Sequence, residues 1–226
     1  MSEPIQPSIG RGVLHLFCKA TPMFEAESVV AAVKTAEAAG VQVVTISTLG
    51  HKSDAAFMAM HEDWVKLRAL QSSLQRAGLE VVDSYVSLTE VSEYAKGMPE
   101  EMLKGRLYPE IPPRQHHMPA WCFYPMSKKR DAHANWFTLP FEDRKDLMHE
   151  HGTSGRKFAG RVVQYVTGSA GLDDYEWGVT LFAVHPDDLK EVVYTMRFDQ
   201  ASSVYAEFGP FYTGMVVPVE ELVTTL

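Results

Sequence analysis

The feature that most constrains the fold is an order of helix and strand signals that occurs twice along the chain. In the first copy, apolar and β-branched runs alternate with two stretches of helical apolar spacing, which stop at Gly40 and Gly78. The predicted order is strand 12–19, helix 25–39, strand 41–47, strand 55–60, helix 64–77 and strand 79–86. These residues therefore predict a βαββαβ unit.

The same order begins again after a proline-rich stretch. It predicts strand 120–125, helix 140–150 ending at Gly152, strand 161–166, strand 175–183, helix 186–208 and strand 214–219. Between the copies, the prolines predict a connector outside regular structure. The expected organisation is an N-terminal ferredoxin-like repeat (1–95), a connector (96–119) and a C-terminal ferredoxin-like repeat (120–226).

Each βαββαβ unit covers one face of its sheet with helices and leaves the other face open. Two arrangements follow: the open faces can meet in a pseudo-symmetric barrel, or the two modules can stay independent on a linker. We expect the first, so the predicted fold class is α+β, with tandem ferredoxin-like repeats forming a dimeric α+β barrel.

Composition narrows the class of protein. The 226 residues include 21 Lys and Arg against 29 Asp and Glu, a formal net charge of −8, which disfavours nucleic-acid coating and lipid binding. No apolar run approaches the roughly twenty residues of a membrane span, and the chain starts without a signal-peptide pattern. Cys18 and Cys122 lie in apolar runs and predict buried free thiols. We expect a cytoplasmic protein that binds neither nucleic acid nor a membrane.

The densest candidate site is a strand that runs into three consecutive cations, 128–130. If this strand is extended, Tyr124, Met126 and Lys128 share one face and place a phenol beside an ammonium group. This pairing suits a ligand with an apolar body and an acidic edge. The alternative is a strand that ends in a solvated basic turn.

Two other charged or titratable candidates have equally simple structural explanations. His151 directly precedes Gly152, where an imidazole can cap the end of a helix instead of binding a ligand. Arg197 has apolar neighbours in the predicted helix 186–208 and needs an anion, which Asp199, Glu207 or a ligand carboxylate can supply.

Aromatic residues and signature motifs add little by themselves. Trp136 and Trp177 fit either core aromatics or the lining of an aromatic pocket. The sequence contains no HExxH zinc motif, no P-loop and no Gly-x-Ser-x-Gly nucleophile motif.

Seven short segments in family-like order are more specific than any single motif. They are 106–110 (RLYPE), 124–130 (YPMSKKR), 135–136 (NW), 151–156 (HGTSGR), 168–169 (GS), 173–182 (DDYEWGVTLF) and 196–211, which begins MRFD and ends FGPF. Together they resemble coproheme decarboxylases, the haem-synthesis branch of the chlorite dismutase family. The resemblance implies a dimeric α+β barrel, a homopentamer and a porphyrin site in the C-terminal half.

The resemblance also implies a reaction. Iron coproporphyrin III (coproheme) is substrate and cofactor together, and hydrogen peroxide is the oxidant that converts two propionates into vinyls in turn, giving haem b. The proximal iron ligand maps to His151, and imidazole is a common axial ligand of haem iron. The catalytic tyrosine maps to Tyr124, a phenol that is neutral at pH 7 and oxidisable to a radical that takes hydrogen from the propionate.

Further positions follow from the same motifs. The porphyrin-binding residues implied are Arg106, Lys128, Trp136, Gln164, Arg197 and Ser202. Arg and Lys suit the binding of carboxylates, whereas Ser202 is five residues from Arg197 and would face differently on one helix. Chlorite dismutases carry an arginine at the position of Gln164, so the neutral amide favours the decarboxylase branch over chlorite turnover. A haem-binding or haem-delivery protein without turnover remains the alternative.

One departure from the family concerns the connector. The stretch between Arg106 and Tyr124 is a few residues longer than expected and carries Arg114, His116 and His117. The longer loop can displace Arg106 or cover the pocket differently. The two histidines fit a solvated loop or a second base near the entrance.

Overall fold

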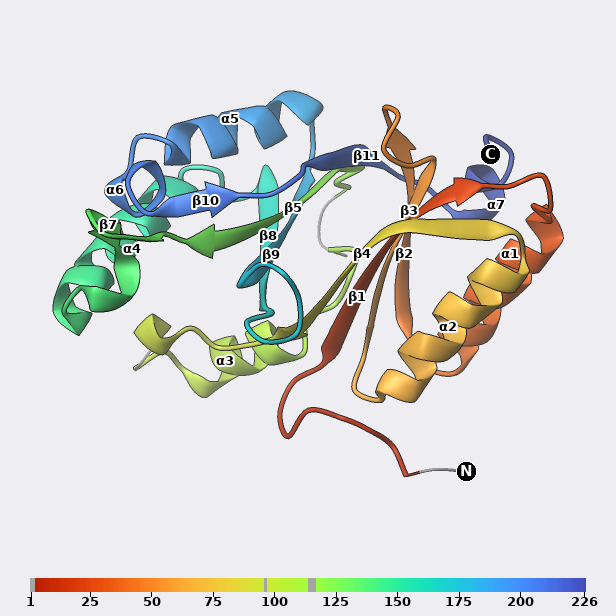
Figure 1. Cartoon of the computed structure of the whole chain (residues 1–226), viewed down its shortest axis with the longest axis horizontal. Coiled ribbons are helices and arrows are strands. Elements are labelled where there is room, and N and C mark those ends of the chain that lie inside the picture. The colour runs from red at the N-terminus through yellow and green to blue at the C-terminus, as the bar shows by residue number, and fades with distance from the viewer. Residues whose placement is uncertain (1–2, 96, 114–116) are drawn as a thin grey trace.

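A closed β-barrel forms the centre of the computed structural model, which describes residues 3–95, 97–113 and 117–226 (Figure 1). The sheet has nine strands in the order β10-β5-β11-β2-β3-β1-β4-β8-β9, and β9 also pairs with β5. That last pairing closes the ring of eight strands and leaves β10 outside it. The expected α+β barrel of two ferredoxin-like repeats is confirmed.

The first repeat follows the predicted order. Its elements are β1 (Gly12–Ala20), α1 (Ala26–Ala38), β2 (Gln42–Leu49), β3 (Ala55–His61), α2 (Trp64–Arg76) and β4 (Leu79–Thr89). Gly78 follows α2 with a φ of +84°, and a Cβ there would clash with the carbonyl group of Met23. Only glycine fits this left-handed, crowded turn, which explains why α2 ends there.

The second repeat has the predicted strands but different helix bounds. Its elements are β5 (Ala120–Lys128), α4 (Phe141–Arg156), β8 (Val162–Gly168), β9 (Trp177–Ala183), α5 (Pro186–Met196) and β11 (Tyr212–Val216). The predicted end of α4 at Gly152 is wrong, because the helix continues for another turn. His151 therefore lies inside α4 and does not cap its end.

The predicted continuous helix 186–208 is also wrong. It divides into α5, α6 (Gln200–Ser203) and β10 (Ala206–Phe208). Asp199 is the reason, because its carboxylate accepts a hydrogen bond from the Ser202 amide (2.9 Å) and starts a new helix.

The connector contains more regular structure than its prolines predicted. A short 3₁₀ helix, η1 (Glu93–Ala95), precedes α3 (Glu100–Leu107), which begins directly after Pro99. Proline disrupts a helix interior but is tolerated at a helix start, so the prediction of an irregular connector failed here. The remaining short elements are β6 (Arg130–Asp131), β7 (Ala134–Asn135), η2 (Trp136–Thr138) and α7 (Val219–Leu222).

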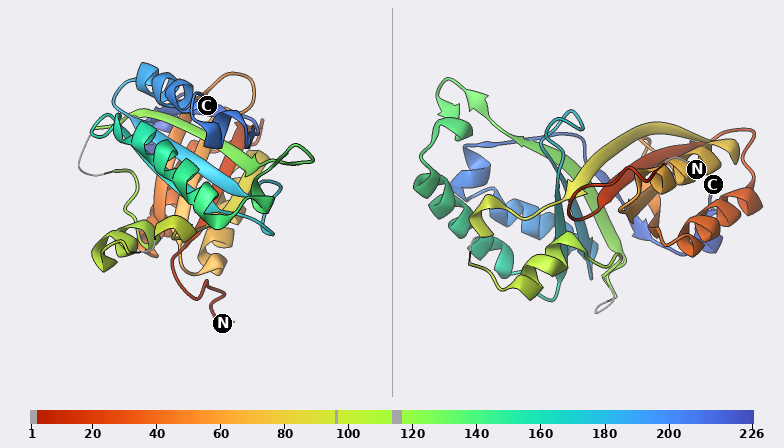
Figure 2. Two further views of the ribbon diagram at one scale, coloured as in Figure 1. Left: turned by 90° about the vertical axis from the view of Figure 1, so that its left-hand side faces the viewer. Right: turned by 90° about the horizontal axis from the view of Figure 1, so that it is seen from below.

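Two helical layers lie on opposite sides of the barrel, α1 and α2 on one side and α4 to α6 on the other (Figure 2). The barrel interior is packed with aromatic side chains, among them Phe17, Trp121, Phe123 and Phe182. Both cysteines are buried free thiols, as predicted. Within the described residues, no helix has the length and apolar character needed to cross a membrane.

Candidate functional site

The outer face of the C-terminal sheet carries several predicted site residues in adjacent rows. Strand pairing places Tyr124 (β5), Val179 (β9) and Val166 (β8) in one row. The next row contains Gln164 on β8, directly opposite Leu181 of β9. Because side chains two residues apart share a face, Tyr124 and Gln164 lie on the same side of the sheet. Two strand spacings, roughly 10 Å, separate the Tyr124 strand from the Gln164 strand.

This face is incompletely covered. Tyr124 and Val179 are buried, whereas Val166 is 46% exposed and Gln164 is exposed. An exposed valine beside an amide on a sheet face otherwise covered by helices marks a surface on which an apolar, planar group can lie.

The helix α4, in the layer over this face, packs loosely. It has 16 residues and none is buried; even Leu147 and Met148 are only half-buried. A helix in a protein core normally buries an apolar stripe against its sheet. The half-buried apolar side chains of α4 are therefore available for contact with an apolar group.

His151 is fixed on α4 by a buried carboxylate. Its Nδ1 lies 3.0 Å from Oδ2 of Asp199, whose side chain is 1% exposed. An ionised carboxylate only accepts hydrogen bonds, so in the neutral imidazole the proton lies on Nδ1 and the lone pair on Nε2. Nε2 forms no hydrogen bond within the described part of the chain. A histidine held in this tautomer is suited to bind a metal ion through Nε2.

Ser202 lies close to the same imidazole, with its Oγ 3.4 Å from Nδ1 of His151. The helix break at Asp199 also means that Ser202 and Arg197 do not share a helix, contrary to the predicted geometry. Ser202 is therefore placed beside His151 and Asp199.

Tyr124 lies in an aromatic environment. Its ring stacks on Phe211 with centroids 4.5 Å apart, and Phe208 lies 5.7 Å away. Burial raises the pKa of the Tyr124 phenol above its ordinary value. The hydroxyl has no hydrogen-bond partner among the described residues and is not a sealed buried atom. It is a neutral phenol free to meet a ligand.

Arg197 is bound to neither of its predicted protein partners. Its guanidinium carbon lies 3.9 Å from the centre of the Phe208 ring, the same ring that contacts Tyr124. The residue is exposed, and no ion pair joins it to Asp199 or Glu207. The cation is therefore available to a ligand carboxylate next to Tyr124.

Lys128 is the buried cation. Its Nζ donates to the carbonyl of Ala201 (2.6 Å) and lies 4.3 Å from the centre of the Trp136 ring. Burial lowers the pKa of Lys128 to about 8, against the attraction of the Asp199 and Glu176 carboxylates. Trp136 is itself 3% exposed and packs edge-on against Tyr205. The predicted shared face holds, since Tyr124 and Lys128 both point to the helical layer.

The predicted porphyrin-binding residue of the connector, Arg106, lies at the surface. Arg106 is exposed in the last turn of α3 and pairs with none of the described residues. Arg114 and His116 lie outside the described residues, and His117 is exposed.

Two residues of this region were missed as site residues by sequence reasoning. Asp199 was considered only as a partner for Arg197, although an Asp three residues before Ser202 is a helix-capping signal. Glu90 gave no sequence signal, yet its carboxylate accepts from the indole nitrogen of Trp177 at 3.0 Å.

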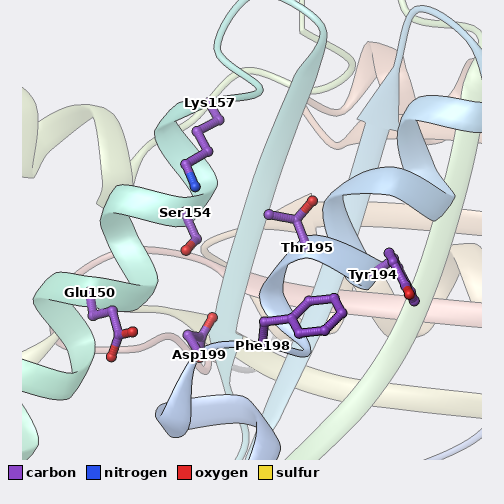
Figure 3. A pocket seen from close by; sticks show the side chains of 7 residues that line it. All are labelled: Glu150, Ser154, Lys157, Tyr194, Thr195, Phe198 and Asp199. Atoms are coloured by element: carbon purple, nitrogen blue, oxygen red, sulfur yellow. The ribbon is translucent and has the colours of Figure 1, made fainter.

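A separate hollow of about 400 Å³ lies between α4 and the end of α5. Figure 3 shows Glu150, Ser154 and Lys157 on one side and Thr195 and Phe198 on the other, with Asp199 beside them. None of its lining residues belongs to the sheet. Asp199 also lines this hollow, but the hollow is distinct from the sheet face that carries Tyr124 and Gln164.

Known proteins are similar to this chain in sequence and in fold. A family model described as chlorite dismutase matches residues 22–217. A coproheme decarboxylase of Staphylococcus carnosus is 42% identical over 187 residues, covering 77% of this chain and 73% of the relative. A putative heme-binding protein of Natronomonas pharaonis is 44% identical over 198 residues, which cover 78% of this chain but 31% of that longer protein.

A solved structure agrees over the full length. A protein described as a novel heme-binding protein, from Thermus thermophilus, superposes with a TM-score of 0.84 at 34% identity, covering 99% of this chain and 98% of that one. The family model spans most of the chain, and the identity to the Staphylococcus protein extends over most of both sequences. The chain belongs to the chlorite dismutase family.

Proposed function

We propose that this protein is a coproheme decarboxylase, which converts iron coproporphyrin III into haem b with hydrogen peroxide. The observation that carries the proposal is His151, held by Asp199 with Nε2 free, in the helical layer over the sheet face of Tyr124 and Gln164. The named activity of the Staphylococcus relative supports the same assignment.

The described residues fit an iron porphyrin. His151 would bind the iron through Nε2, and Asp199 would hold the ring orientation and increase its basicity. The loosely packed α4 and the exposed Val166 would enclose the apolar macrocycle. When bound, the iron supplies the oxidation of the substrate by peroxide. Gln164 would offer a neutral amide from the sheet side of the site.

Tyr124 is the residue assigned to the chemistry. For each propionate, the balance is carboxylate plus hydrogen peroxide and one proton, giving a vinyl group, carbon dioxide and two waters. Once oxidised to a phenoxyl radical, Tyr124 would remove a hydrogen atom from the β-carbon and become a phenol again. The carbon–carbon bond to the carboxylate would then break, releasing carbon dioxide, and the remaining electron would reduce the second oxidising equivalent supplied by hydrogen peroxide. A neutral phenol among phenylalanines suits this role, because it keeps its proton until it is oxidised.

The cations bind the carboxylates that the substrate carries. Arg197 lies on the ring that packs against Tyr124, so it can hold a propionate near the phenol. Arg106 offers a second free guanidinium from the connector. Lys128 and Trp136 form the inner wall, and Ser202 supports the His151 environment.

The test is to load the purified protein with iron coproporphyrin III, add peroxide stepwise and follow the porphyrin by mass spectrometry. We expect loss of two carboxyl groups in sequence, through a three-propionate intermediate. Tyr124→Phe should still bind the porphyrin but lose turnover by a factor of at least about 10². Decarboxylation at the wild-type rate by this variant would refute the role of Tyr124.

A second candidate is a haem-binding protein without turnover, which the names of the Natronomonas and Thermus proteins favour. It predicts tight binding of the porphyrin and only bleaching by peroxide. Chlorite dismutation is disfavoured by Gln164, because a neutral amide holds an oxyanion weakly. Rapid oxygen release from chlorite by the haem-bound protein would contradict this.

Assembly and location belong to the same proposal. The family resemblance supports a homopentamer, which a light-scattering mass would test; a monomer at micromolar concentration would contradict it. The two buried free thiols support a reducing, cytoplasmic compartment.

A further inference from the structure

Trp177 lies on the same sheet face as the proposed catalytic tyrosine, at one end of the proposed porphyrin site. Strand pairing sets Trp177 (β9) opposite Met126 on one side and Gly168 on the other. This row is next to the row of Tyr124, Val179 and Val166. Trp177 is half-buried, so part of its side chain is exposed to solvent.

The carboxylate of Glu90 is held on this face by two features. It accepts the indole N–H of Trp177 at 3.0 Å. It also lies over Gly168, where a Cβ would clash with its Oε2. Any side chain at position 168 would displace the carboxylate. The strand register agrees, because Leu88 pairs with Gly168 and Glu90 is two residues further along the same side of the chain.

This carboxylate is not paired with a cation in the described part of the chain. No described cation forms an ion pair with Glu90. The loop before β9 adds the half-buried carboxylates of Asp173 and Glu176 near the same end of the strand. The pocket therefore has an acidic edge at Glu90, whereas Arg197 forms a cationic position beside Tyr124.

A porphyrin with four carboxylates would be repelled by one edge and attracted by the other. Two unpaired carboxylates in a partly desolvated site repel strongly. We propose that Glu90, positioned by Trp177 and Gly168, excludes propionates from its edge of the pocket and so fixes the in-plane orientation of the substrate. Glu90 is thus a positioning residue that determines which propionates reach Tyr124. The inference rests on the proposed function and deepens it.

The test measures orientation without turnover. In the cyanide complex of iron coproporphyrin III, proton NMR resolves the four ring methyl groups, and each bound orientation gives its own set of signals. Glu90→Gln removes the charge but keeps an oxygen that accepts from the indole. Asp174→Asn is the matched control, because it removes an exposed carboxylate of the loop before β9, whereas the Trp177 indole donates its hydrogen bond to Glu90.

We expect one dominant set of methyl signals for the wild type and for Asp174→Asn. For Glu90→Gln, a second set should appear, with the ratio of the two orientations reduced by about tenfold. A single set in Glu90→Gln, identical to that of the wild type, would overturn the inference and leave the proposed function intact. Failure of the wild type to bind iron coproporphyrin would instead refute the proposed function.

Discussion

The two helical layers of this barrel come from the same βαββαβ pattern but pack very differently. In the first repeat, α1 and α2 bury apolar stripes against the sheet, among them Val29, Val33, Leu70 and Leu74. In the second repeat, α4 buries no residue at all. The second repeat buries an apolar stripe of α5 against its sheet but leaves α4 loosely packed, whereas both helices of the first repeat are packed. The proposed site lies where packing is missing.

The largest expected effect tests this difference through stability. Leu74→Ala removes a fully buried side chain from α2 and should lower the free energy of unfolding by about 2–5 kcal/mol. Leu147→Ala is the matched change in α4, where the side chain is only half-buried, and should cost less than about 1 kcal/mol without ligand. Urea unfolding of the wild type and of both variants measures the two losses of unfolding free energy. Equal losses would show that α4 packs as tightly as α2.

The next effect concerns the histidine of the loosely packed helix. Asp199→Asn keeps a cap for α6 but removes the charge that fixes the imidazole. Affinity for iron coproporphyrin should fall by about 10- to 100-fold, or about 1.4–2.7 kcal/mol. Binding of metal-free coproporphyrin should stay unchanged, since it needs no axial ligand. An equal loss for both porphyrins would assign Asp199 to folding alone.

A smaller effect concerns the interior shared by both repeats. His15 on β1 is buried, and its Nε2 lies 2.9 Å from Oγ1 of Thr180 on β9. Burial lowers the pKa of His15 from 6.5 to about 3. As the pH falls below 6.5, His15 takes up a proton in the unfolded state before it does so in the folded state. The contribution of buried, neutral His15 to the free energy of unfolding is therefore complete above pH 6.5 and is lost as the pH falls toward 3.

The loss should be about 1.4 kcal/mol for each pH unit within that window. His15→Gln should unfold with a flatter dependence on acid than the wild type, as measured by urea midpoints at pH 7 and pH 5. Parallel curves would show that His15 is not buried in its neutral form.

The sequence was sufficient for the order of the elements, because apolar periodicity and helix-ending glycines are local signals. It failed where a local signal was ambiguous. Gly152 resembles a helix end but lies within α4, and the apolar spacing after Pro186 concealed the new start at Asp199.

The same limit applies to the site. The shared face of Tyr124 and Lys128 follows from strand alternation and was predictable. The contacts of His151 with Asp199 and of Glu90 with Trp177 join segments 48 and 87 residues apart. No periodicity within one element encodes such pairs, since only the closure of the barrel and the packing of its helices bring them together.

The most direct test of the central claim is amide hydrogen exchange with and without iron coproporphyrin III. We predict slower exchange in α4 (Phe141–Arg156) and β8 (Val162–Gly168) on binding, because the porphyrin supplies the packing that α4 lacks. Exchange in α1 and α2 should not change. Protection confined to α1 and α2, or spread evenly over both helical layers, would contradict the claim that the second repeat holds the site.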